Sequence, residues 1–209
     1  MKNFPKAGLL IITLVIPALI FVLLRLFATN HYDLPYLNPE VGTDGKIVIA
    51  NGDTVFQRRS TLQLASGNYE IANDISVVSF LPKDCGDTCK LVLSNLKRIY
   101  DMRSEENSLT IKTLTEDSVF TSEAYPEELG KEGWKTLKAT QSEVTDILNQ
   151  KSSSLLKTAE LSPIESRLML IDSKGYTRGF YNGADPEEID RLMAEVKILN
   201  YENKVSANP

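Results

Sequence analysis

The sequence is poor in the residue types that build several common functional sites. Its 209 residues include two cysteines and one histidine, so a tetrahedral zinc site lacks the ligands it needs. Neither a glycine-rich phosphate loop nor a Gly-x-Ser-x-Gly turn is present. The net charge is −5 with both signs interspersed, and no basic patch favours nucleic acid. We therefore expect no nucleic-acid partner and no phosphate chemistry.

One long apolar run does occur, close to the N-terminus. Ala7–Phe27 reads AGLLIITLVIPALIFVLLRLF, about the length that crosses a bilayer as a helix. Lys2 and Lys6 precede this run, whereas the acidic residues Asp33 and Glu40 follow it, which predicts a cytoplasmic N-terminus. A cleaved signal sequence is the alternative, but its apolar region is usually shorter. The sequence predicts a single-pass anchor in the inner or plasma membrane, with the rest of the chain on the extracytoplasmic (periplasmic) side.

The length suits one folded domain rather than two. The predicted plan is an N-terminal segment over 1–6, a transmembrane anchor over 7–28, an extended stalk over 29–44, a domain over 45–203 and a tail over 204–209. The stalk is predicted because HYDLPYLNPE contains two prolines and no amphipathic period.

The first half of the domain predicts a β-α-β unit. A turn at Asn51-Gly52-Asp53 favours an N-terminal hairpin between Lys46–Ala50 and Thr54–Gln57. Ile75–Leu81 is uncharged and β-branched, as a central strand requires. Apolar residues at helical spacing follow from Cys89 to about Met102, and Leu109–Leu114 predicts the next strand.

The second half predicts two helices and a hairpin. Thr140 and Glu143 have the spacing of a capping box. Arg167–Ile171 and Tyr176–Tyr181 flank a glycine-containing turn, and Asp185 is placed to cap a final helix. This order of elements predicts an α/β, thioredoxin-like fold with a mixed sheet flanked by helices.

The two cysteines, Cys85 and Cys89, fall where the buried strand turns into a helix. A helix N-terminus stabilises a thiolate in its first turn, and we expect this to favour Cys85, although Asp84 and Asp87 oppose a nearby anion. A structural bridge is the alternative, but one closing so short a loop removes little chain entropy. The predicted site is therefore Cys85 and Cys89, acting in redox or metal chemistry.

The stretch Ser79–Asp101, SFLPKDCGDTCKLVLSNLKRIYD, resembles the active-site segment of the Sco (SenC) family, with its Cys-Pro-Asp-x-Cys motif. The C-terminal stretch LMLIDSKGYTRGFYNGADPEEIDRLMAEVKIL is also similar. The resemblance implies a membrane-anchored thioredoxin-fold protein of copper handling and cytochrome c oxidase assembly, in which both cysteines and a distant histidine bind copper. Here Gly86 replaces the motif proline, and Leu161–Glu165, where that histidine is expected, contains none.

Three functions follow as hypotheses. The first is thiol–disulfide exchange, with Cys85 attacking and Cys89 resolving, serving a respiratory oxidase subunit or a thiol reductant. The second is a Cu(I) chaperone that binds metal through both cysteines and a ligand from its partner. The third is an assembly domain with an inert disulfide. The one histidine, His31, lies beside the predicted membrane and is interpreted as an interfacial residue.

Overall fold

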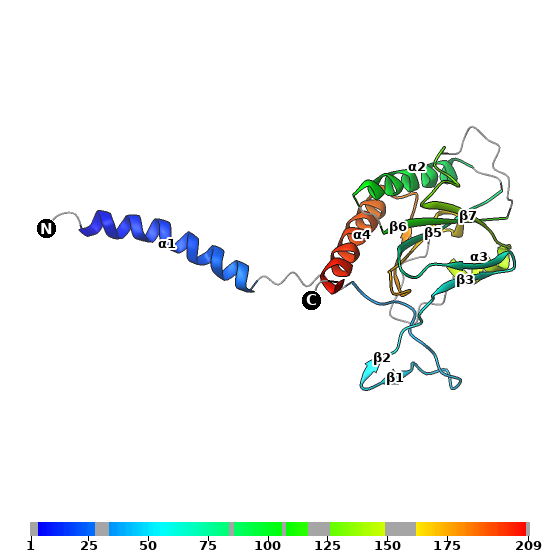
Figure 1. Ribbon diagram of the computed structural model, residues 1–209, viewed down its shortest axis with the longest axis horizontal. Helices are drawn as coiled ribbons and strands as arrows, with labels where there is room; N and C mark the ends of the chain where they lie inside the picture. Colours follow the sequence, from blue (N-terminus) through cyan, green and yellow to red (C-terminus); the bar gives the residue numbers. More distant parts are fainter. Residues whose placement is uncertain are drawn as a thin grey trace. The chain divides into compact units, whose positions relative to one another are not determined.

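The computed structural model describes residues 4–27, 34–83, 86–105, 108–116, 126–148 and 162–207, and the chain forms two units, Met1–Asp33 and Leu34–Pro209. The first unit contains helix α1 (Phe4–Phe27), with Pro17 inside it (Figure 1). The helix predicted from the apolar run is thus present. Among the helices of the described ranges, however, none combines the length and hydropathy of a membrane span, so the predicted span is not confirmed.

The second unit is built on a five-stranded mixed sheet in the order β7-β6-β5-β8-β9. Its strands are β5 (Ile75–Leu81), β6 (Leu109–Thr115), β7 (Trp134–Lys138), β8 (Arg167–Ile171) and β9 (Thr177–Asn182). Strands β5, β6 and β7 run parallel, whereas β8 is antiparallel to both of its neighbours. Leu81, Thr115 and Lys138 lie in register at the carboxyl edge of the three parallel strands.

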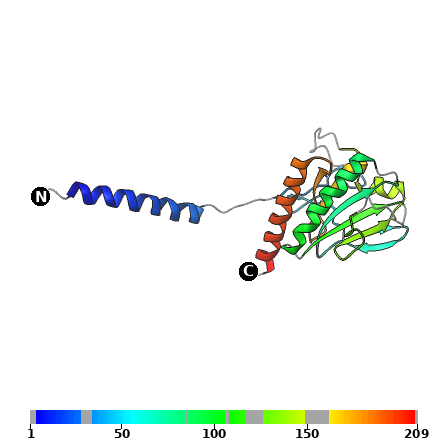
Figure 2. The same ribbon diagram turned by 90° about the horizontal axis from the view of Figure 1, so that it is seen from above.

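Both faces of this sheet are covered (Figures 1 and 2). Helices α2 (Asp87–Asp101) and α4 (Pro186–Ala207) pack on one face, while helix α3 (Gln141–Leu148) and the hairpin of β3 (Thr61–Leu64) and β4 (Gly67–Glu70) pack on the other. Single-turn 3-10 helices η1 (Met102–Ser104) and η2 (Ile164–Ser166) follow α2 and precede β8.

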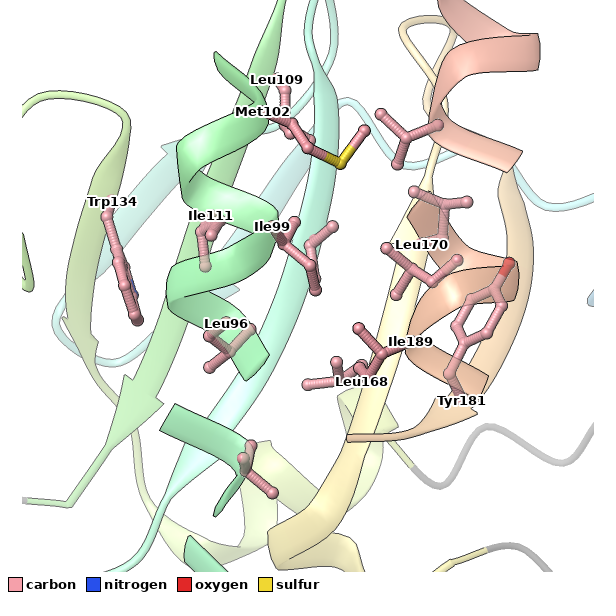
Figure 3. Packing of buried hydrophobic residues seen from close by; sticks show 14 of the residues in the cluster. Leu96, Ile99, Met102, Leu109, Ile111, Trp134, Leu168, Leu170, Tyr181 and Ile189 are labelled. Atoms are coloured by element: carbon pink, nitrogen blue, oxygen red, sulfur yellow. The ribbon is translucent and has the colours of Figure 1, made fainter. Parts of the chain in front are cut away.

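The two core clusters meet across β5, whose side chains alternate between them. Val77 belongs to the cluster under α2 and α4, whereas Val78 belongs to the cluster under α3. All seven residues of β5 are buried for this reason. Figure 3 shows Leu96 and Ile99 of α2 beside Ile111 of β6 in the first cluster. The central strand predicted from the apolar run is confirmed.

An N-terminal hairpin of β1 (Ile49–Ala50) and β2 (Asp53–Thr54) precedes the sheet. Its turn residues Asn51 and Gly52 both have positive φ, 54° and 91°, a conformation that Asn and Gly adopt most readily. The predicted hairpin is confirmed, with shorter strands than expected.

The predicted stalk differs from the structure over its described part, from Leu34 onward. The Leu37 amide donates to the Thr177 carbonyl at 2.9 Å, and Leu34 packs against the core under α2 and α4. Arg178 lies 4.0 Å from the Tyr36 ring centroid. The prolines exclude a helix here, but they leave the segment free to pack as extended chain. At the other end, α4 extends to Ala207, through most of the predicted tail.

Helix α3 begins with the predicted capping box. Thr140 donates its amide and its hydroxyl to Glu143 Oε2 at 2.7 and 2.8 Å, and the Glu143 amide donates back to Thr140 Oγ1 at 3.4 Å. We expect Thr140→Ala to lower the free energy of unfolding by about 1 kcal/mol, since the Glu143 amide loses its hydroxyl acceptor and Glu143 Oε2 loses a hydroxyl donor. Urea unfolding measures this loss, and Thr145→Ala inside the same helix serves as the control. An unchanged midpoint for Thr140→Ala would contradict the prediction.

Candidate functional site

Cys89 lies in the first turn of α2, directly after the central strand β5. The helix begins at Asp87, and its N-cap, Gly86, is extended, with φ −75° and ψ −171°. The Cys89 side chain is 3% exposed and belongs to the same core cluster as Leu81. Its sulfur is disulfide-bonded. The structure therefore places one predicted site residue at the junction of strand and helix, whereas Cys85 lies outside the described residues.

The start of α2 places Cys89 in the first turn of the helix. The helix begins at Asp87, and the extended backbone of Gly86 precedes it. Amides at this position lack partners within the helix. The predicted order of strand, turn and helix is therefore present around Cys89.

The first turn of α2 carries an exposed ion pair. Lys90 Nζ lies 3.3 Å from Asp87 Oδ1, and both side chains are exposed. An exposed pair of this kind contributes little energy because water screens it. The predicted opposition of Asp87 to a thiolate is weakened accordingly.

Helix α2 is held by a buried polar contact that the sequence analysis missed. Asn95 Nδ2 donates to the Gly183 carbonyl at 2.9 Å, and the Gly183 amide donates to the Ser166 carbonyl at 2.6 Å. A Cβ at Gly183 would lie 3.2 Å from Val92 and 3.0 Å from that carbonyl, so the approach is close. These contacts fix α2, η2 and the β9–α4 turn to one another. The sequence did offer one signal for this contact: Asn95 is a polar residue among the apolar residues Val92 and Leu96, which form the buried side of the helix.

The segment η2 occupies the place where the resemblance implies a histidine. It packs against α2 and β5, and it presents Ile164 and Glu165, both half-buried, instead of an imidazole. In the described ranges no three His, Cys, Asp or Glu side chains come together to hold a metal. A sulfur in a disulfide is also not the thiolate that copper binds. The described donors do not fit a copper site, and we derive no step through copper.

The geometry defines a class of protein. A central parallel strand, a cysteine-bearing helix start, a mixed sheet and a C-terminal hairpin with its helix make this a mixed α/β protein of the thioredoxin-like class. Within that class, the chain resembles solved structures of Sco proteins.

Three such structures illustrate the likeness. A SCO1/SenC family lipoprotein from Bacillus anthracis is 16% identical, with 68% of this chain and 92% of that chain covered and a TM-score of 0.46. BsSco, a member of the Sco family of cytochrome c oxidase assembly proteins, is 18% identical over 68% and 91%, with a TM-score of 0.47. Apo Sco1 from Thermus thermophilus is 17% identical over 66% and 88%, with a TM-score of 0.44. No family model matches the chain, and no curated protein matches it.

Proposed function

We propose that this protein is a Sco-like thiol–disulfide oxidoreductase that acts through Cys85 and Cys89. One observation carries the proposal: a disulfide-bonded cysteine, Cys89, lies buried in the first turn of the helix that follows the central parallel strand. Amides without helical partners surround such a position and favour a developing sulfur anion. The sequence resemblance around the two cysteines supports the same chemistry.

The proposed reaction moves two electrons from the protein to a partner disulfide. In the dithiol form, the Cys85 thiolate attacks one partner sulfur, an S–S bond forms between the proteins, and the other partner sulfur leaves as a thiolate that takes up a proton. The Cys89 thiolate then attacks the Cys85 sulfur and expels the second partner thiolate. The protein ends as a Cys85–Cys89 disulfide and the partner as a dithiol. A dithiol reductant of the extracytoplasmic space returns the protein to its starting state.

The burial of Cys89 supports the second role for this residue. A sulfur on a side chain that is 3% exposed is shielded from an external disulfide, but a covalently attached partner on Cys85 brings the reacting bond to it. The rigid packing of α2 through Asn95 keeps this sulfur in place. The proposal therefore has Cys85 as the attacking thiol and Cys89, in the first turn of α2, as the resolving thiol.

The setting of the reaction is also a proposal. The apolar helix α1 would anchor the chain with its N-terminus in the cytoplasm and its domain on the periplasmic side, where thiols can be oxidised. The partner would then be a respiratory copper-site protein, such as a cytochrome c oxidase subunit, whose thiols must be reduced before copper enters. The charge bias around the apolar run and the Sco resemblance support this setting.

Thiol trapping of the full-length chain in detergent tests the proposed chemistry. In a series of thiol–disulfide buffers, we expect the wild type to pass between disulfide and dithiol with a two-electron slope. With an excess of a disulfide-bonded substrate protein, Cys89→Ser should accumulate the mixed disulfide, whereas Cys85→Ser should form none. Thr88→Ser, an exposed neighbour on the same turn, is the matched control and should behave as the wild type.

Two results would contradict the proposal. A disulfide that resists reduction at about −300 mV would be a structural bridge, because that potential lies below the buffers that reduce exchange-active pairs. Tight anaerobic binding of Cu(I) by the wild type, lost in Cys85→Ser, without any turnover of disulfides would favour the copper-chaperone alternative.

A further inference from the structure

The N-terminal hairpin of β1 and β2 and the segment that leads into it carry exposed apolar side chains. Val41, Ile47 and Ile49 are 51%, 40% and 67% exposed, and we call these three residues the apolar patch. None of residues 39–57 belongs to either core cluster, and Figure 1 shows the hairpin standing apart from the five-stranded sheet. Gathered apolar side chains on a surface mark contact with a protein or a membrane. The proposed exchange site does not account for them.

The three side chains of the apolar patch share one face. Val41 and Ile47 are partners in an antiparallel bridge, so their side chains point to the same side. Ile49 follows Ile47 by two residues along the extended chain and shares its face. Val48, between them, is half-buried on the opposite face. A strand that is apolar on both faces is typical of one that is covered on both faces, and we infer that something covers the apolar patch.

The charges around the apolar patch are mainly negative. Glu40, Asp44 and Asp53 are exposed on this segment, against one exposed lysine, Lys46. Anionic lipid surfaces attract basic segments, so these carboxylates oppose such a surface. An uncharged, zwitterionic lipid surface imposes no such penalty. The charges therefore favour neutral lipid over anionic lipid.

Lipid is also the apolar medium that the chain itself brings near. Helix α1 exposes Leu14 and Phe21 at 67% and 74%, and a helix that is apolar all round requires an apolar environment. The chain from Phe27, the last residue of α1, to Leu34, where the second unit begins, spans at most about 25 Å. Lipid that surrounds α1 is thus within reach of the domain.

A protein partner fits the apolar patch less well. Each partner of a stable complex buries about 800 Å², far more than three aliphatic side chains supply. A bilayer sets no such minimum area, because each side chain of this size that leaves water raises the partition coefficient about tenfold or more.

We propose that Val41, Ile47 and Ile49 enter the headgroup region of a neutral, zwitterionic bilayer. The inference rests on the membrane setting of the proposed function and adds a second point of contact beside α1. Two points of contact limit the rotation of the domain about its tether, which one anchor leaves free. The domain would then present its exchange site to partners in one orientation.

Tryptophan quenching in vesicles tests this contact on the full-length chain. The vesicles consist of phosphatidylcholine, a share of which is brominated near the top of its acyl chains. The chain's one tryptophan, Trp134, is 0% exposed and gives a constant background. In Ile49→Trp we expect the bromines to lower the emission of the added indole about twofold, because interfacial side chains enter about 5–10 Å.

Leu91→Trp is the matched control, since Leu91 is also an exposed aliphatic residue, 45% exposed, but lies on α2. Its added indole should keep its emission. Replacing part of the phosphatidylcholine by phosphatidylglycerol should weaken the quenching of Ile49→Trp, because the carboxylates beside the apolar patch are repelled. Stronger quenching on the anionic vesicles would contradict the choice of a neutral surface.

The outcomes separate this inference from the proposed function. Vesicle-bound Ile49→Trp without quenching, or with no more quenching than Leu91→Trp, would overturn the inference and leave the membrane setting standing. If the unquenched chain also sediments in detergent as a dimer that Ile47→Ser with Ile49→Ser dissociates, a second copy covers the apolar patch instead. A chain that does not float with the vesicles would overturn both the inference and the membrane setting, whereas thiol trapping in detergent decides the exchange reaction separately.

Discussion

An Arg178→Ala variant is expected to lose about 4 kcal/mol of its free energy of unfolding, because it leaves a buried carboxylate without its partner. Arg178 Nη1 lies 2.9 Å from Asp172 Oδ2, and the two side chains are 3% and 5% exposed. Asp172 also accepts the amides of Lys174 and Tyr176 at 3.0 and 2.9 Å. Urea unfolding of the full-length chain measures the loss as a fall in midpoint at unchanged slope.

A second consequence concerns the N-terminal segment of the domain. Arg178 Nη2 donates to the Leu34 carbonyl at 2.6 Å, and its guanidinium stacks on Tyr36. In Arg178→Ala both contacts disappear, so we expect limited proteolysis to cut near Leu34 well below the urea concentration that unfolds the domain. The same cut should be slow in the wild type.

The matched control for this prediction is Arg98→Ala. Arg98 pairs with Asp190 at 2.8 Å, but these side chains are 45% and 68% exposed, and exposed pairs contribute about 1 kcal/mol or less. Equal losses for Arg98→Ala and Arg178→Ala would show that burial does not decide the effect. Replacing Arg178 by leucine and Asp172 by asparagine together should recover much of the loss, because no unpaired charge remains and the asparagine Oδ1 can still accept the Lys174 and Tyr176 amides.

The sequence predicts best those elements whose own residues carry the pattern. Strands β5 and β8 have the predicted bounds, Ile75–Leu81 and Arg167–Ile171, because each is an uninterrupted buried run between clear breaks. The final helix begins at Pro186 after Asp185, whose side chain accepts the Glu187 amide at 2.9 Å. The capping residues next to the helix were sufficient to predict where this helix begins.

Strands β3, β4 and β7 were not predicted, since their stability comes from partners distant in the sequence. Strand β7, WKTLK, lies at an edge of the sheet and exposes Lys135 and Lys138 between its buried residues. Its Trp134 indole donates to Thr113 of β6 at 2.9 Å, a contact that no local pattern reveals. The β3–β4 hairpin likewise depends on the core beneath α3.

The candidate site was likewise predictable only where neighbouring residues define it. Cys89 follows a buried strand closely in the sequence, so its location beyond the end of that strand was predictable, whereas the start of α2 depended on the backbone of Gly86. The contact of Asn95 with Gly183 joins residues 88 apart in the chain, and that of Arg178 with Leu34 joins residues 144 apart. The packing of the whole domain brings such pairs together, so no local pattern of residues predicts these contacts.

The remaining large effect concerns Lys112, a lysine buried in strand β6. Its amine is surrounded by hydroxyls, donating to Ser76 Oγ and Thr110 Oγ1 at 2.9 Å each, and the residue is 6% exposed. Burial lowers its pKa from 10.5 to about 8, against the favourable charge of Asp74. The hydroxyls solvate the ammonium only in part, since none of them carries a compensating charge.

The direction of the pH effect follows from the two states of this lysine. Below pH 8 the amine is charged in both the folded and the unfolded chain, so the folded state bears the full cost of a buried cation. Between pH 8 and 10.5 the folded protein loses the proton while the unfolded chain keeps it, and stability rises. Above 10.5 the cost is gone. The contribution of this one group amounts to about 3 kcal/mol.

Lys112→Met removes the charge and keeps most of the side-chain volume. At pH 7 we expect the variant to gain about 1–3 kcal/mol in free energy of unfolding, because the desolvation cost disappears while Ser76 and Thr110 still bond to each other at 3.1 Å. Urea unfolding at pH 7, 8, 9 and 10 gives the comparison, with Lys138→Met as the control, since Lys138 is an exposed lysine on the neighbouring strand. The difference between wild type and Lys112→Met should shrink as the pH rises through this interval, and the difference for Lys138→Met should stay constant. A wild type that remains as far below Lys112→Met at pH 10 as at pH 7 would show that the buried amine keeps its proton, and that the hydroxyls of β5 and β6 solvate it as well as water does.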